Sequence, residues 1–225
     1  MEFTPFFLSF KLAFVVSILL FLLCVPFAWF LFQTKNKIKP FLEALVALPL
    51  VLPPSVLGFY ILVTFAPDST VGRFLQNYFN LKLVFTFEGL IVASMIYSLP
   101  FMLQPIQNGF ESLNKGMIEA SYLSGKGKLT TLLRVALPNI KPSLVSAFII
   151  TFAHTVGEFG VVLMVGGNIP QETKVASVAI YEMVEVMDYE SAHIYSALLL
   201  GLSFCVLLFV YIFQARHKQD VRVGL

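Results

Sequence analysis

Charged side chains are scarce in this 225-residue sequence, where they make up 12% of the residues against about 25% in ordinary soluble domains. With 58% hydrophobic residues, the chain has too few polar groups to cover a water-soluble surface, which excludes a soluble enzyme. Intrinsic disorder is excluded as well, because it requires low hydrophobicity and high charge. The 15 basic and 13 acidic residues nearly balance, so the charge does not indicate nucleic-acid binding.

Cysteine and histidine are also rare. Cys24 and Cys205 both stand in apolar runs, and we expect each to be a small core residue rather than half of a disulfide or a metal ligand. The three histidines are scattered, and the sequence has no HExxH or GxSxG motif, so neither a metal site nor a catalytic site is predicted. A signal peptide is not predicted either, because no basic segment precedes the first apolar run.

Long apolar runs predict an all-α integral membrane protein, a polytopic helical bundle in which each span needs about 20 mostly apolar residues. Five runs qualify: 6–32, 42–65, 89–110, 144–165 and 193–213. A sixth span over 175–187 is the alternative, but this stretch is short and carries two glutamates. We expect it to form a helix that lies at the outer surface or dips partway into the membrane. Because no internal repeat or linker is found, residues 1–225 are predicted to form a single transmembrane domain.

The basic residues predict the orientation of the chain. Eleven of the 15 fall on one side if five spans alternate, and these are Lys35, Lys37, Lys39, Lys115, Lys126, Lys128, Arg134, Lys141, Arg216, Lys218 and Arg222. The positive-inside rule places this side and the C-terminus in the cytoplasm, with the N-terminus outside. The loop over 166–192, which then lies outside, carries five acidic residues against Lys174 alone.

The predicted cytoplasmic loop between the third and fourth spans, about 111–142, is long. Residues typical of helices flank a Gly-Lys-Gly turn that begins at Gly125, where glycine can redirect the chain. We expect the second helical piece to run to Leu137 and to end at Pro138. A P-loop would need Gly five residues before its Gly-Lys pair, where this chain has Ala120 or Tyr122, so ATP hydrolysis is not expected here.

The same loop resembles the motif of ABC importer permeases, which runs Glu-Ala-Ala, three residues, Gly, nine residues, Ile, one residue and Leu-Pro. With Ser and Val as mild replacements, the matching positions are Glu119, Ala120, Ser121, Gly125, Val135, Leu137 and Pro138. The resemblance implies a cytoplasmic coupling helix that seats in an ATP-hydrolysing partner subunit. It also implies a non-catalytic chain without cofactors, since ATP and Mg would be bound by that partner. A surface helix without a partner is the alternative, but spacing this long rarely recurs by chance.

Three prolines interrupt the second predicted span. Pro49, Pro53 and Pro54 remove backbone donors and break the helix. In lipid the freed carbonyls need partners, so such a break packs against protein or lines a cavity. The prolines therefore indicate a hinge or a lining of the transport pathway, and a static kink is the alternative.

The fourth predicted span carries polar and small residues that are typical of a gate. These are His154, Gly157, Glu158, Phe159 and Gly160. His154 and Glu158 are four residues apart and should share one helix face. An ionisable group inside a span indicates a functional site, although Glu158 neutralised by His154 or by a backbone donor would be structural only. Gly157 and Gly160 permit close helix approach or local unwinding.

These segments narrow the resemblance to importers of molybdate and sulfate. The elements that carry it are Gly157–Gly160, Gly167–Pro170, Thr173, Ile180–Tyr181 and the run over 48–60. The run over 48–60 is closer to the molybdate branch, and the resemblance extends over about 6–213. It implies the permease subunit of an importer for molybdate or tungstate, and a sulfate or thiosulfate importer is the alternative.

The resemblance further implies a homodimer in the cytoplasmic (inner) membrane of a bacterium or archaeon, surrounded by lipid, with an ABC ATPase subunit inside and an oxyanion-binding protein outside. The spans hold almost no Arg or Lys, and Glu158 would repel a dianion, so we expect a transient passage, with selectivity in the binding protein. A proton-coupled secondary transporter with Glu158 and His154 as its relay is a further alternative, but its usual internal repeats are absent.

Overall fold

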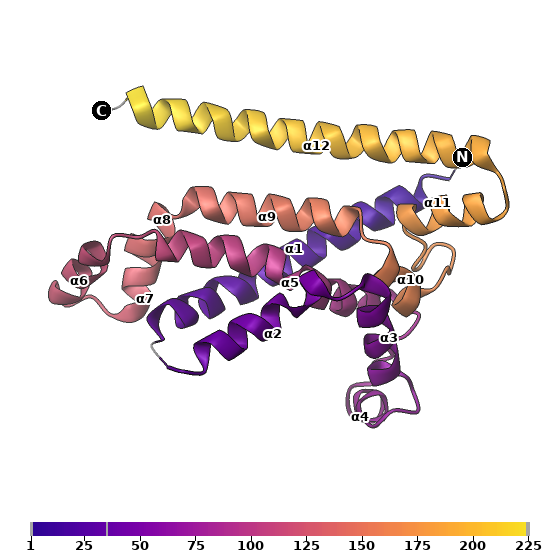
Figure 1. Cartoon of the computed structure of the whole chain (residues 1–225), viewed down its shortest axis with the longest axis horizontal. Helices are drawn as coiled ribbons and strands as arrows, with labels where there is room; N and C mark the ends of the chain where they lie inside the picture. The colour runs from indigo at the N-terminus through magenta and orange to yellow at the C-terminus, as the bar shows by residue number, and fades with distance from the viewer. Residues whose placement is uncertain (1, 35, 224–225) are drawn as a thin grey trace.

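The computed structural model describes residues 2–34 and 36–223, and every regular element in this part of the chain is a helix (Figure 1). Lys35 and the side chains of Arg216, Lys218 and Arg222 lie outside the description. Three helices pack side by side as a central bundle, and these are α1 (Thr4–Gln33), α5 (Phe87–Glu111) and α9 (Lys141–Val156). The long helix α12 (Tyr189–Val223) runs along one side of them.

The helices agree with the predicted polytopic bundle. In the described residues α1, α5 and the Tyr189–Phe209 part of α12 are each long and apolar enough to cross a membrane. Two bent helix pairs raise the number of spans to as many as five. The first, third and fifth predicted spans therefore coincide with continuous helices, and the interruptions fall in the other two.

The second predicted span is a bent pair, α2 (Lys39–Val51) and α3 (Pro54–Phe65), with an angle of 112° between them. Pro53 has an extended backbone with φ −55° and ψ 138°, and Pro54 has no N–H to continue the helical hydrogen bonds. Pro49 remains inside α2. The predicted break is confirmed at Pro53 and Pro54, where two adjacent prolines redirect the chain, whereas Pro49 does not interrupt its helix.

The fourth predicted span is interrupted too. Helix α9 ends at Val156, and a second short helix, α10 (Gly160–Gly166), follows after three residues. Gly157 caps α9, and Phe159 precedes α10 with φ −129° and ψ −65°, outside the helical region. The local unwinding that the glycines predicted is confirmed.

Four short helical elements form one end of the molecule, at the left in Figure 1. They are α6 (Lys115–Leu123), α7 (Lys128–Thr131), the π-helical turn η1 (Leu132–Ala136) and α8 (Leu137–Asn139). The expectation that Pro138 ends this run is wrong, because proline is tolerated in the first turn of a helix and the chain stays helical to Asn139. The break falls at Ile140, where the run and α9 meet at 78°.

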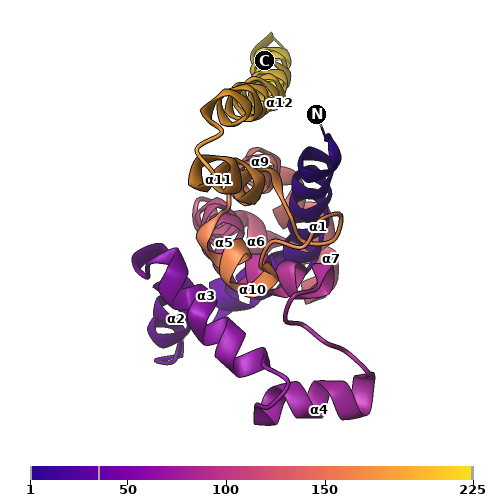
Figure 2. The ribbon, with the colours of Figure 1, turned by 90° about the vertical axis from the view of Figure 1, so that its right-hand side faces the viewer.

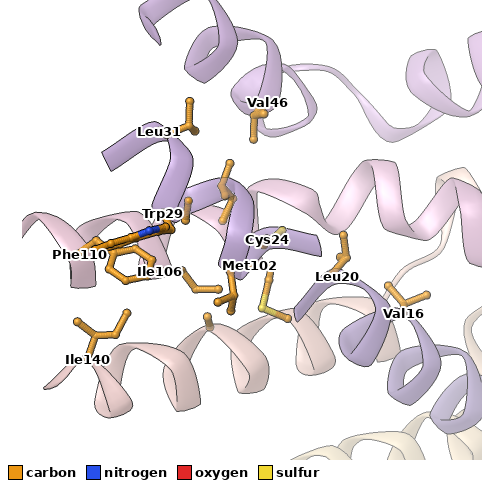
Figure 3. Packing of buried hydrophobic residues seen from close by; sticks show 14 of the residues in the cluster. Val16, Leu20, Cys24, Trp29, Leu31, Val46, Met102, Ile106, Phe110 and Ile140 are labelled. Atoms are coloured by element: carbon orange, nitrogen blue, oxygen red, sulfur yellow. The ribbon is translucent and has the colours of Figure 1, made fainter. Parts of the chain in front are cut away.

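The core fills the space where α1 and α5 meet, and Figure 3 shows its side chains. Trp29 packs on Phe110 with ring centroids 5.3 Å apart, and Cys24 and Met102 lie farther along the same contact. The prediction that Cys24 is a core residue is confirmed. The same prediction is wrong for Cys205, which is exposed because α12 lies at the edge of the bundle.

The other end of the molecule gathers α10, α11 (Ala176–Glu185), the start of α12 and the N-terminus (Figures 1 and 2). Tyr195 in α12 donates a hydrogen bond to the carbonyl of Glu2, 2.9 Å away. Helix α11 has 10 residues and a length of about 15 Å, half of the hydrocarbon thickness, so it does not form a sixth span. Helix α4 (Thr70–Phe79) lies outside the bundle (Figure 2).

Candidate functional site

The predicted coupling segment folds into a hairpin over residues 115–139, which we call the coupling hairpin. The Asn114 side chain accepts a hydrogen bond from the Gly116 amide at 2.9 Å and so begins α6. At the turn Gly125 has φ +75°, a conformation that favours glycine. The amides of Gly125 and Lys126 donate to carbonyls at the end of α6 and close the turn. The predicted turn is confirmed.

A buried hydrogen bond joins the two arms of the coupling hairpin. The hydroxyls of Ser121 in α6 and Thr131 in α7 lie 2.8 Å apart, and both residues are buried. Ser121 stands where the permease motif has its second Ala. The buried hydroxyl is satisfied by its partner, which explains why the replacement is tolerated at this position.

The seven motif residues divide between the inside and the surface of the hairpin. Those turned inward are Ser121, Val135 and Leu137, whereas Glu119, Ala120, Gly125 and Pro138 are exposed. Beside the turn, two exposed leucines were not predicted as site residues: Leu123 is 90% exposed and Leu129 is 68% exposed. Two such apolar side chains beside a cationic turn indicate a docking surface. In the sequence, the position of these leucines close to the Gly-Lys-Gly turn could have indicated them as site residues.

Polar contacts tie the coupling hairpin and its end of α5 to the first two spans. The Gln33 side-chain amide donates to the Tyr122 hydroxyl at 2.7 Å, which joins α1 to α6. Lys39 in α2 pairs with Glu111 at the end of α5 at 3.2 Å. These contacts would therefore transmit a displacement of this end of the molecule to α1, α2 and α5 together.

The two broken spans meet each other, although about a hundred residues separate them in the sequence. A Cβ on Gly160 would stand 2.8 Å from the Cβ of Pro54, so only glycine permits this approach. One turn farther along α3, a Cβ on Gly58 would stand 2.8 Å from the Cβ of Met164 in α10. We call this contact, between the breaks at 52–53 and 157–159, the junction.

Glu158 lies in the junction and is 4% exposed. Neither of its carboxylate oxygens has a hydrogen-bond partner among the described residues, and the Ser94 hydroxyl is likewise buried and unpaired. An unpaired buried polar group is costly, so it is retained where it serves a function or meets a partner in another state. The Glu158 side chain therefore remains a candidate for the pathway. Burying its carboxyl without a hydrogen bond destabilises this part of the fold.

His154 does not meet Glu158. The expectation of a shared helix face is wrong, because α9 ends at Val156 and Glu158 lies beyond its end. Nδ1 of His154 lies 3.0 Å from the Ser98 hydroxyl in α5, and its ring stacks on Phe101 at 3.8 Å. His154 thus joins α9 to α5.

Residues of the loop over 166–192 hold the junction in place. The Ser177 hydroxyl donates to the carbonyl of Glu158 at 2.6 Å, and Phe159 packs on the Tyr181 ring at 5.0 Å. Lys174 pairs with Glu182, and its hydrogen bond lowers the pKa of this carboxyl. The motif residue Tyr181 therefore stabilises the break at 157–159 by packing on Phe159.

Helix α9 connects the coupling hairpin to the junction directly. It begins at Lys141, just after the hairpin, and ends at Val156, next to Gly157, the first residue of the break. Its 16 residues form a rod of about 24 Å. A rigid helix between an exposed hairpin and a break in the membrane can transmit a displacement from one to the other.

Residues 13–222 match the family described as "Binding-protein-dependent transport system inner membrane component". The chain belongs to this family. The permease is 45% identical to the "Molybdenum transport system permease protein ModB" of Azotobacter vinelandii, over 91% of this chain and 90% of that protein. It is 31% identical to the "Sulfate transport system permease protein CysT" of Salmonella typhimurium, over 93% of this chain and 75% of that protein.

Solved structures show the same fold. A bacterial ABC transporter involved in the import of alginate superposes with a TM-score of 0.76 at 15% identity, over 96% of the permease and 80% of that chain. The MetNI methionine ABC transporter superposes with a TM-score of 0.64 at 20% identity, over 98% and 94%. The predicted fold class and the resemblance to ABC importer permeases, including the molybdate branch, are confirmed.

Proposed function

We propose that two copies of this permease form the membrane pathway of an ATP-driven importer for molybdate or tungstate. The observation that carries the proposal is the 45% identity to the A. vinelandii molybdenum permease over nearly the full length of both chains. The identity to the sulfate permease of S. typhimurium is lower, at 31%, and covers less of that protein. A sulfate or thiosulfate importer is therefore the second candidate.

In this proposal the coupling hairpin docks on a cytoplasmic ABC ATPase subunit, which binds ATP and Mg, while the permease itself is non-catalytic. The exposed leucines Leu123 and Leu129 support docking, because a partner would cover them. The 24 Å rod of α9 carries the displacement to the junction, where the packing of Gly160 on Pro54 changes when the pathway opens. These contacts support a coupling role for the motif residues and a gating role for the broken spans.

The proposal places selectivity in an oxyanion-binding protein outside the membrane. A tight site for a dianion would use Arg or Lys side chains, and the junction has the buried carboxyl of Glu158 instead. Weak binding suits a passage, because a tightly held ion would not leave. The family, which is described as dependent on binding proteins, supports this division of labour and argues against a stand-alone secondary transporter.

The orientation follows the positive-inside rule, with the coupling hairpin in the cytoplasm and the N-terminus outside. The contact of Gln33 with Tyr122 supports it, since the end of α1 and the hairpin lie at the same end of the bundle. The hydrogen bond of Tyr195 to Glu2 joins the N-terminus to the opposite end. The protein is thus proposed to be a multi-pass component of a bacterial or archaeal inner membrane.

The test is ATP hydrolysis by the transporter reconstituted in liposomes with its ATPase subunit and its binding protein. Molybdate, tungstate, sulfate and no oxyanion are compared at equal binding-protein concentration, and omission of the binding protein is the matched control. We expect stimulation by molybdate or tungstate and none by sulfate. Stimulation by sulfate alone would retain the importer and overturn the substrate. Failure to associate with any ABC ATPase subunit would overturn the importer.

A further inference from the structure

Helix α4 lies apart from the bundle and across its direction. Figure 1 shows it end-on, while α1, α5 and α9 run across the page, and Figure 2 shows it lengthwise. Its axis is therefore roughly perpendicular to the spans and parallel to the plane of the membrane. Its packing partner in the chain is α3, at the end of the second predicted span.

The base of α4 is fixed independently of what covers its free face. The Ser69 hydroxyl accepts a hydrogen bond from the Gly72 amide at 2.8 Å and begins the helix. A Cβ at Gly72 would overlap the carbonyl of Ala66, so only glycine lets the helix approach the end of α3 this closely. Asn80, in the left-handed conformation with φ 52°, ends it. The orientation of α4 is thus built into the chain.

The helix is divided into an apolar and a polar face. The apolar residues recur at the spacing of one helix face, and they are Val71, Phe74, Leu75, Tyr78 and Phe79. Arg73, Gln76 and Asn77 stand on the opposite face. The aromatic side chains are turned away from the rest of the chain, with Tyr78 76% exposed, Phe79 61% exposed and Phe74 52% exposed.

The exposed rings form one small aromatic cluster. The centroid of Phe74 lies 4.8 Å from that of Tyr78 and 6.0 Å from that of Phe79. Helix α3, on which α4 packs, also exposes aromatic side chains, with Phe59 49% and Tyr60 64% exposed. An apolar surface of this kind is unfavourable in water, so something apolar covers it.

We propose that α4 lies in the interfacial layer of the outer leaflet, with its aromatic face toward the lipid acyl chains and Arg73 and Asn77 toward the headgroups and water. Three observations favour lipid over a protein partner. The axis is parallel to the membrane plane, the apolar face is aromatic as in the belts at membrane interfaces, and α3, on which α4 packs, exposes aromatic side chains as well. The helix would anchor α3, and through α3 it would set the outer side of the junction.

The test is spin labelling of α4 in the complete transporter in liposomes. A single label is placed at Phe74→Cys or Tyr78→Cys, with Asn77→Cys on the polar face as the matched control. The exposed Cys205 is replaced by Ser, and the buried Cys24 stays. The accessibility of each label to oxygen, which concentrates in lipid, and to a water-soluble nickel chelate is measured, and retained ATP hydrolysis shows that the labelled proteins are folded.

We expect oxygen to exceed the nickel chelate as a relaxing agent at positions 74 and 78, and the order to reverse at position 77. Immobile labels at 74 and 78 that neither agent reaches would overturn the proposal in favour of a second copy or the binding protein. Omission of the binding protein then separates these two occupants. If the nickel chelate relaxed the labels at 74 and 78 more strongly than oxygen, the aromatic face would be in water, and this result would also overturn the proposal.

A second measurement avoids the label. Tyr78→Trp in a Trp29→Phe background leaves one tryptophan in α4, and Asn77→Trp is the control. We expect lipids brominated in the acyl chain to quench the fluorescence at position 78 more strongly than at position 77. Equal quenching at the two positions would overturn the interfacial placement. The outcome is independent of the oxyanion that the transporter carries.

Discussion

The turn of the coupling hairpin offers a substitution whose cost is set by the backbone alone. Gly125 has φ +75° and no heavy atom within 4 Å of the place where a Cβ would stand. Gly127, two residues later, has equally open surroundings but an ordinary extended backbone with φ −72° and ψ 167°. Gly125→Ala and Gly127→Ala therefore add the same methyl group to the same turn, and only the first is strained.

The magnitude follows from the left-handed conformation, which costs a residue with a Cβ about 1–2 kcal/mol. A free energy of this size shifts the equilibrium between two forms of the turn by roughly 5–30-fold. Gly125→Asn should cost less, because Asn visits this conformation more readily than Ala. We expect the equilibrium to shift most in Gly125→Ala and less in Gly125→Asn. In Gly127→Ala it should change by no more than about twofold.

The assay measures how tightly the ATPase subunit binds the permease in liposomes, and how strongly the loaded binding protein stimulates ATP hydrolysis at limiting ATPase subunit. We expect Gly125→Ala to weaken the apparent affinity and to lower stimulated hydrolysis and uptake together. Basal insertion of the permease, measured by its amount in purified membranes, should not change. A bulkier Gly125→Val adds contact with the partner to the strain and should uncouple hydrolysis from uptake.

The reasoning would be refuted if Gly125→Ala and Gly127→Ala gave the same affinity and the same hydrolysis. Equal behaviour would mean that the turn changes conformation when it docks, so that φ +75° is not the form the partner binds. Wild-type activity of Gly125→Val would go further and remove the hairpin from the coupling contact altogether.

Three further substitutions test the hairpin and the junction. Gly160→Ala, whose Cβ would stand 2.8 Å from that of Pro54, should destabilise the purified permease by about 1–3 kcal/mol in thermal unfolding, whereas Gly157→Ala, with 3.8 Å of space, should not. Ser121→Ala leaves a buried hydroxyl in α7 without its partner and should cost about 1–3 kcal/mol, and unchanged unfolding would show that this hydroxyl finds another acceptor. Glu158→Gln replaces a buried carboxyl that has no hydrogen-bond partner among the described residues with an amide, and it should leave assembly intact while lowering oxyanion-stimulated hydrolysis; normal hydrolysis would leave Glu158 a structural role only.

Much of this architecture is determined by local properties of the sequence. The apolar runs locate α1, α5 and the membrane part of α12, because water excludes such segments and a helix satisfies its own backbone in lipid. The prolines at 53 and 54 and the glycines at 157 and 160 locate both breaks, since these residues remove donors or relax the backbone. The Gly-Lys-Gly turn that begins at Gly125, flanked by residues typical of helices, locates the turn of the hairpin.

Other features depend on packing between distant segments, which no local pattern specifies. The sequence indicates two breaks but not that Gly160 meets Pro54, and spacing on a helix suggested that His154 faces Glu158. That suggestion was wrong because α9 ends at Val156, before Glu158. His154 instead contacts Ser98 of α5. The 112° bend and the burial of the Glu158 carboxyl without a hydrogen-bond partner among the described residues are equally products of this packing.

The amphipathic helix α4 stands between these cases. Its spacing of apolar residues, from Val71 to Phe79, is a helical signal that the sequence itself contains. The sequence does not specify the direction in which the aromatic face points, because this direction depends on the close approach of Gly72 to Ala66 at the end of α3. Hydrophobicity thus decides where a chain enters the membrane, while steric contacts between remote residues decide which side chains are left facing the lipid, the pathway or a partner.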